Sequence, residues 1–186
     1  MPAVTNALAN HIAISVSDGE AAVKWYKEVL GLREIVPLQT VSASGPDRGP
    51  TLRQIYGPGL EEMKLAILST GNGVGIEIFE FTNPPYKGPS EPVKFGPDVY
   101  ARGAFFHVCF TVPDVKATAE IAVKLGGRIC GEPSQPLSGI DVVYLQDPWG
   151  NTLEFLPLGW EQLWLEFLSR ALQKQKGADA EGSKIL

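Results

Sequence analysis

The sequence has few of the residues that mark several common classes of protein. It contains 2 cysteines among 186 residues, far below the density of a secreted disulfide framework. Basic residues number 16 against 21 acidic ones, and the net charge of −5 makes nucleic acid and anionic membranes poor partners. No apolar run approaches the roughly 20 residues of a membrane-spanning helix. We therefore expect a cytoplasmic protein whose partner is a small molecule, with no nucleic-acid or membrane partner.

Histidine is equally scarce, and its two positions reveal an internal repeat. The only histidines are His11 and His107. Each begins a run of alternating apolar residues, and an aspartate follows each by seven positions, at Asp18 (18 − 11) and Asp114 (114 − 107). A repeat of this kind determines how the whole fold is interpreted.

Each copy is predicted to form a strand followed by a helix. From each histidine onward, apolar residues alternate with polar or small ones, as in a strand with one apolar face. Asp18 and Asp114 are suitable helix N-caps, while Gly31 and Gly126 stand where helices would end. Further strands are predicted in the first copy at three places: Leu52–Tyr56, Lys64–Leu68 and Gly75–Phe81. In the second copy they are predicted near Arg128 and at 142–146 and 152–156.

These patterns predict an α+β fold in which two paired βαβββ modules form a curved, half-open mixed β-barrel with a C-terminal helix. The expected segments are a first module, a proline-rich linker, a second module, the helix and a flexible tail, at 8–81, 82–103, 104–158, 159–175 and 176–186. The helix carries an apolar stripe that includes Trp160, Leu163 and Phe167. We expect this stripe to pack on the outer face of the sheet, with a dimer contact as the alternative.

The last strands of the two modules also correspond. Glutamate follows glycine by four positions in both, at Gly73 and Glu77 and again at Gly150 and Glu154. Alternation places each glutamate opposite the apolar face that the helix of its module would cover. A single histidine or glutamate in a strand is more often a structural residue than a ligand. The joint pattern favours a site for one divalent metal (Zn, Ni, Co, Mn or Fe(II)), with His11, Glu77, His107 and Glu154 as ligands.

The repeat and its motifs resemble the vicinal oxygen chelate superfamily, which includes glyoxalase I, bleomycin resistance proteins and extradiol dioxygenases. The resemblance covers roughly residues 8–158 and includes Trp25–Leu32 and Asp147–Asn151, the latter just before Glu154. It implies that the four residues above are the metal ligands, in a set closest to that of glyoxalase I. It also implies a lyase or isomerase that works by metal-assisted proton transfer, with Glu154 as the base and Glu77 second.

Two positions favour a substrate other than a glutathione conjugate. Glyoxalase I commonly has arginine and asparagine where this chain has Ser15 and Phe81, and neither replacement can bind a peptide in the same way. The residues expected to face the substrate are apolar or weakly polar: Phe79, Phe81, Cys109 and Leu156. They predict an apolar or aromatic substrate with a metal-chelating oxygen pair. We expect a homodimer, and two alternatives stay open, an iron(II) ring-cleaving dioxygenase and a non-catalytic module that sequesters a small molecule.

Overall fold

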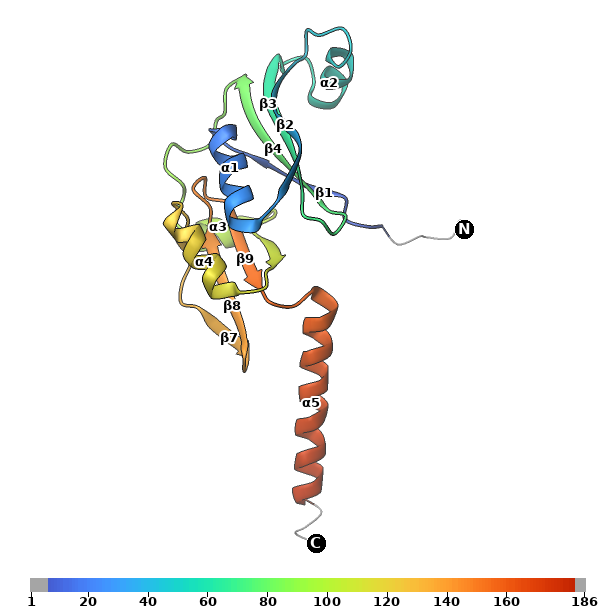
Figure 1. Cartoon of the computed structure of the whole chain (residues 1–186), viewed down its shortest axis with the longest axis vertical. Coiled ribbons are helices and arrows are strands. Elements are labelled where there is room, and N and C mark those ends of the chain that lie inside the picture. Colours follow the sequence, from blue (N-terminus) through green and yellow to red (C-terminus); the bar gives the residue numbers. More distant parts are fainter. Residues whose placement is uncertain (1–6, 183–186) are drawn as a thin grey trace, which may run out of the picture. The chain divides into compact units, whose positions relative to one another are not determined.

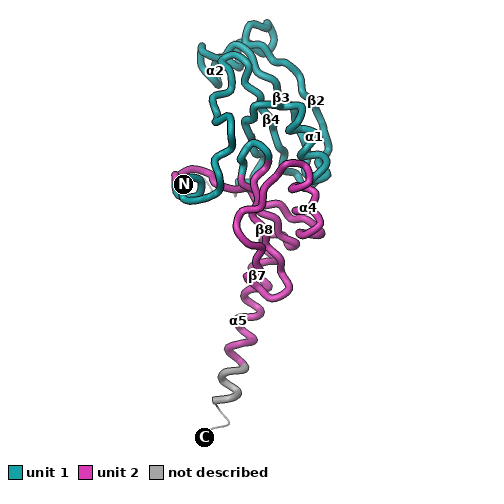
Figure 2. Tube along the Cα trace, turned by 90° about the vertical axis from the view of Figure 1, so that its left-hand side faces the viewer, with its two compact units in different colours: residues 1–101, 148–151 teal, residues 102–147, 152–186 magenta. Residues whose placement is uncertain are grey.

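The computed structural model describes residues 7–182 of the chain. The chain divides into two compact units, which Figure 2 distinguishes by colour. Unit 1 is Met1–Ala101 with Pro148–Asn151, and unit 2 is Arg102–Asp147 with Thr152–Leu186. Each unit contains one copy of the sequence repeat, with a mixed sheet and a helix that follows its first strand. The mixed α+β class predicted from the sequence is therefore confirmed, and neither sheet is a closed barrel.

Unit 1 contains a four-stranded sheet whose spatial order is β1-β4-β3-β2. Its elements, in chain order, are β1 (His11–Ser15), α1 (Gly19–Leu30), β2 (Arg33–Ser42), α2 (Gly49–Tyr56), β3 (Glu62–Ser69), β4 (Gly75–Asn83) and α3 (Pro97–Tyr100). Strand β1 pairs with β4 in parallel, and the other pairs are antiparallel. The two strands expected to carry His11 and Glu77 are therefore direct neighbours.

Helix α1 covers one face of this sheet (Figure 1). The side chain of Asp18 accepts a hydrogen bond from Ala21 N at 3.0 Å, as an N-cap does, and Gly31 ends the helix in the left-handed conformation with φ of 66°. At the start of the helix, Gly19 N donates to Glu80 Oε2 at 2.8 Å. Since Glu80 shares its face with the buried Ile78, the face that carries Glu77 is the opposite one.

One predicted strand of the first module is wrong. Residues 52–56 belong to helix α2, and the strand that follows α1 is β2. Pro50 favours a helix here, because proline suits a first helical turn. Pro37, by contrast, lies inside β2, where the pairing with β3 shifts register between Val36 and Gln39. A proline cannot donate to the ladder, but β2 is at the edge of its sheet and tolerates it at an irregularity.

Unit 2 has the same arrangement of a first strand, a helix and further strands, without a helix between its second strand and the later ones. Its elements are β5 (Val108–Thr111), α4 (Val115–Lys124), β6 (Arg128–Ile129), β7 (Ser134–Leu137), β8 (Ile140–Gln146), β9 (Thr152–Leu156) and α5 (Trp160–Gly182). The sheet order is β5-β9-β8-β6, with β7 paired to β8. Asp114 caps α4 by accepting from Ala117 N at 2.9 Å, as Asp18 caps α1. Strands β8 and β9 lie where the sequence predicts them.

Helix α5 is longer than the predicted 159–175, and residues 183–186 of the predicted tail lie outside the described part of the chain. Two residues of its stripe, Leu163 and Phe167, pack on a different face from the one predicted, while Trp160 is 68% exposed. Leu163 joins a buried cluster with Ile140, Val142 and Leu156, on the face of β9 that also carries Glu154. The other face, with the fully buried Phe155, is already covered by α4.

The described residues include no helix that is both long and apolar enough to cross a membrane.

Candidate functional site

In unit 1, neighbouring strands bring His11 and Glu77 together. The parallel pairing of β1 with β4 sets Ala13 beside Glu77, so His11, two residues before Ala13, lies on the same face. His11 Nε2 lies 3.5 Å from Glu77 Oε2, and the His11 side chain is 49% exposed. The other ring nitrogen, Nδ1, is 2.8 Å from Asn10 Oδ1. When Nδ1–H donates a hydrogen bond to Asn10 Oδ1, Nε2 keeps the lone pair that a metal needs.

Unit 2 brings His107 and Glu154 together in the same way. His107 Nε2 lies 3.2 Å from Glu154 Oε2, and both side chains are less exposed than their counterparts in unit 1, at 26% and 14%. His107 Nδ1 is buried and has no hydrogen-bond partner within the described part of the chain. The two pairs therefore have the same backbone framework but different surroundings.

Glu154 is contacted by two more side chains from neighbouring strands. The strand pairing sets Cys109 on one side of Glu154 and Tyr144 on the other. Burial, the charge of Glu154 and a side-chain hydrogen bond to it raise the pKa of the Cys109 thiol to about 12, although the residue itself is exposed. The same causes, in the same order, raise the pKa of the Tyr144 hydroxyl. Both groups are thus neutral donors to the Glu154 carboxylate near pH 7.

Tyr144 is a site residue that the sequence analysis did not identify. It is in the predicted strand 142–146, but only the observed register places it opposite Glu154. Its ring also meets that of His107 edge to face, with centroids 5.3 Å apart. The corresponding positions in unit 1, beside Glu77, hold Ala13 and Ile67, neither of which can donate from its side chain.

An aromatic group lies beside Glu77 instead. Phe79 and Phe81 follow Glu77 on the same face and stack with centroids 5.8 Å apart. Tyr56, from the unpredicted helix α2, meets both rings, at 6.5 Å and 6.2 Å. Burial and then the charge of Glu77 raise the pKa of Tyr56, which places its hydroxyl within the field of that carboxylate. This part of the face is therefore apolar, with one phenol at its edge.

The four residues expected to contact the substrate differ in access. Phe79 is 7% exposed and belongs to a core cluster with Leu52 and Met63, while Leu156 is 5% exposed and is packed under α5. Phe81 is half-buried and Cys109 is exposed. Phe81 and Cys109 are therefore open to a ligand, whereas Phe79 and Leu156 support the surface from beneath.

The α2 and α5 helices occupy equivalent places in their units. In unit 1, α2 packs on Phe79, two positions beyond Glu77, and in unit 2, α5 packs on Leu156, two positions beyond Glu154. Each helix covers the apolar end of its face and leaves the end with the histidine more accessible. The histidine and glutamate of each unit thus lie at the accessible end of a largely apolar surface.

The chemistry of each pair suits a borderline cation. An imidazole nitrogen and a carboxylate oxygen are ligands for zinc, nickel, cobalt, manganese or iron(II). Within either unit, the described side chains gather no group of three or more histidine, cysteine, aspartate or glutamate residues able to hold a metal. Each unit by itself therefore supplies one histidine and one glutamate.

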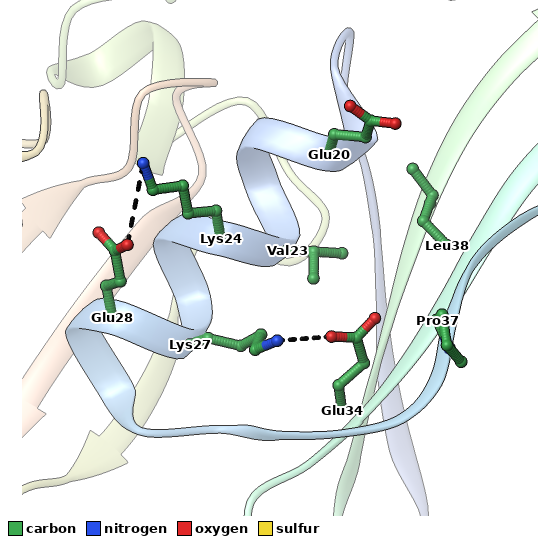
Figure 3. Close-up of a pocket in the computed structure, with 8 residues that line it drawn as sticks. All are labelled: Glu20, Val23, Lys24, Lys27, Glu28, Glu34, Pro37 and Leu38. Carbon is green, nitrogen blue, oxygen red and sulfur yellow. Dashed lines mark hydrogen bonds and ion pairs between the residues drawn. The ribbon is translucent and has the colours of Figure 1, made fainter.

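A hollow on the α1 side of unit 1 has a different character (Figure 3). It has a volume of about 410 Å³ and lies between α1 and β2. Its charged residues pair with one another: Lys27 Nζ is 2.6 Å from Glu34 Oε2, and Lys24 Nζ is 3.9 Å from Glu28 Oε1. Because these four side chains are paired and the hollow lies across the sheet from Glu77, it adds no group to the candidate site.

Comparison with known proteins identifies the family of the chain. A family model described as Glyoxalase/Bleomycin resistance protein/Dioxygenase superfamily matches residues 8–155. A 2-epi-5-epi-valiolone epimerase from Actinomyces sp is 28% identical over 154 residues, covering 80% of this chain and 78% of the relative. An ethylmalonyl-CoA/methylmalonyl-CoA epimerase from Cereibacter sphaeroides is 30% identical over 139 residues, covering 73% and 85%.

The solved structures agree on the fold. A glyoxalase family protein from Bacillus cereus aligns with a TM-score of 0.68 at 22% identity, covering 84% of this chain and 97% of that one. Taken with the match over residues 8–155, the chain belongs to the Glyoxalase/Bleomycin resistance protein/Dioxygenase superfamily.

Proposed function

We propose that the chain is a metal-dependent enzyme that binds one divalent cation through His11, Glu77, His107 and Glu154 and transfers a proton next to a substrate carbonyl. One observation carries the proposal: both units place a histidine Nε2 close to a glutamate oxygen, at 3.5 Å and 3.2 Å, on corresponding strands. If each module contributes half of the metal ligands, both copies of the repeat are expected to contain the same histidine–glutamate pair.

The surroundings of the pairs support a cation. Glu154 is only 14% exposed, and a carboxylate withdrawn from water requires compensation of its charge. Neutral imidazoles, with Asn10 accepting from Nδ1 of His11, would leave both Nε2 atoms available as ligands. A cation held by two carboxylates and two imidazoles would balance both negative charges, which a neutral histidine alone does not.

The proposed chemistry assigns distinct tasks to the residues. A bound cation would polarise a substrate carbonyl as a Lewis acid and so make the adjacent carbon more acidic. The Glu154 carboxylate would accept the proton from that carbon, and a proton delivered to the opposite face, for which Glu77 is the candidate group, would invert the centre. Tyr144 and Cys109 hold the carboxylate in place through their hydrogen bonds, and Glu77 is the second candidate for the base.

The relatives favour an epimerase or a related isomerase or lyase. Two of the similar proteins are epimerases, and a third, from Haemophilus influenzae, is a lactoylglutathione lyase at 26% identity over 148 residues. Ser15 and Phe81 favour a substrate that is not a glutathione conjugate. We therefore propose epimerisation or isomerisation of a carbonyl compound with an apolar part.

Metal analysis of the untagged protein tests this proposal. Plasma mass spectrometry is expected to find close to one divalent metal per chain, with most of it lost in His107→Ala. Lys24→Ala removes a side chain on α1, across the sheet from Glu77, and is the control, which should keep its metal. Protein that neither carries metal nor takes up zinc, nickel or iron(II) would exclude the enzyme and favour a sequestering module. Iron(II) with oxygen consumption would favour the dioxygenase.

The expected homodimer and cytoplasmic location are part of the same proposal. Sedimentation equilibrium of the metal-loaded and metal-free protein tests the first, and a monomer in both states would exclude it.

A further inference from the structure

A second hollow lies on the Glu77 face of unit 1, beyond the aromatic residues. It has a volume of about 290 Å³ and is lined by Ser15, Phe81 and the segment 84–88. Ser15 pairs with Phe79 in the β1–β4 register and shares its face with His11, so the hollow belongs to the same side of the sheet as the proposed ligands. The site described so far assigns it no role.

The position of the hollow fixes the length of a ligand that could use both places. Phe81 follows Glu77 by four residues on β4, a distance of about 13 Å along the strand. Between them the face is apolar, with the half-buried Leu65 and Ile67 on β3 and the ring of Tyr56 above. A molecule bound at Glu77 by its oxygens would therefore need an apolar body of about 10 Å to reach the hollow.

Backbone hydrogen bonds and close side-chain packing fix the walls of the hollow. The chain turns back after β4, where Tyr86 N donates to Phe81 O at 2.9 Å, and a bridge joins Thr82 to Pro85. The Tyr86 ring lies so close over Gly88 that a side chain at that position would collide with it. Two prolines and two aromatic rings form most of the lining, and its polar groups belong to Ser15, Tyr86 and the exposed Lys87. An apolar cavity of about 150 Å³ already admits benzene, so this hollow has room for a ring or a chain of several carbons.

We propose that this hollow is the subsite for the non-reacting end of the substrate, and that the substrate class is an elongated carbonyl compound with an apolar tail. The inference rests on the proposed function for the position of the reacting end. Phe81 and Tyr56 select for the tail, and Ser15 sets the depth of the hollow at the β1 side.

A length series of ligands tests the proposal directly. The probes are straight-chain 2-oxo acids of four to sixteen carbons, whose adjacent oxygens can chelate a cation, titrated by calorimetry into the zinc-loaded full chain. Each methylene that enters the hollow should raise the affinity by up to about fourfold. The rise should begin at the chain length that reaches Phe81 and stop when the hollow is full.

Two variants test whether the rise in affinity with chain length arises in the hollow. Ser15→Phe fills the hollow from an exposed strand position and should abolish the rise with chain length while leaving metal content and the affinity for 2-oxobutanoate unchanged. Thr40→Phe adds the same ring to the opposite face of the same sheet and should behave as the wild type. A flat series in the wild type, or a Ser15→Phe variant that keeps the rise, would overturn the proposal. A rise with chain length in protein that binds no metal would support the hollow but refute the proposed metal enzyme.

Discussion

Replacing Tyr144 by phenylalanine tests the role of the donors around Glu154. The substitution removes one hydroxyl and keeps the ring that meets His107 at 5.3 Å, so packing is preserved. The lost hydrogen bond goes to a carboxylate, and such bonds contribute about 1.5–3 kcal/mol. Removing a group that orients a metal ligand typically weakens metal binding by about 10–100-fold, which is consistent with that range. We expect the zinc dissociation constant of Tyr144→Phe to rise by this factor.

Competition with a fluorescent chelator at pH 7.5 measures the change. Tyr100→Phe is the matched control. Tyr100 is the last residue of α3, is half-exposed and contacts Phe95, so its replacement should leave zinc affinity within about twofold of wild type. Thermal unfolding of the metal-free variants checks that the fold is intact. A Tyr144→Phe protein that folds normally and binds zinc as tightly as the wild type would refute an orienting role for this hydroxyl.

Three further predictions concern stability and the buried thiol. Asp18→Ala and Asp114→Ala each remove an N-cap and should lower the free energy of unfolding by about 1 kcal/mol, measured in urea; no change in either would contradict the capping geometry. Phe155→Ala empties a fully buried position and should cost about 3–5 kcal/mol, whereas Phe105→Ala, 96% exposed, should cost less than about 0.5. Burial raises the pKa of Cys130 to about 11, so its alkylation in the folded protein, followed by peptide mass spectrometry, should accelerate about tenfold per pH unit from pH 8 to 10. A pH-independent alkylation rate would contradict the raised pKa of Cys130. Because this pKa is higher in the folded protein than the ordinary thiol value of about 9, the contribution of Cys130 to stability is lost as pH rises from about 9 toward 11.

The fold was predictable where the sequence pattern is local. Alternation from His11 and His107, together with the caps Asp18 and Asp114, predicted the first strand and helix of both units, because these features depend on residues within a few positions of one another. The face on which each glutamate lies also followed from the repeat, whereas the register that brings each glutamate close to its histidine is seen only in the structure.

The errors arise where tertiary structure outweighs local preference. Leu52–Tyr56 has the β-branched and aromatic residues of a strand, yet it forms α2, where Leu52 is buried against Met63 and Phe79. The stripe of α5 was assigned to the outer face of the sheet, although α4 was already expected there, and Leu163 packs instead on the face of Glu154. Both cases concern which surface an amphipathic segment finds, and that depends on contacts distant in sequence.

The differences between the two units matter more to the proposed chemistry than their likeness. The repeat places a glutamate on β4 and on β9, but its neighbours are Ala13 and Ile67 in one unit and Cys109 and Tyr144 in the other. Since hydrogen-bond donors restrain a carboxylate and apolar groups do not, Glu154 is held on three sides, while Glu77 pairs with His11 and has apolar neighbours on β1 and β3. The apolar residues that follow Glu77 instead form a surface leading to the hollow at Phe81. A duplicated framework can thus supply equal ligands to a metal while one half restrains its carboxylate and the other accommodates the substrate, and this division is set by side chains that the repeat does not conserve between its copies.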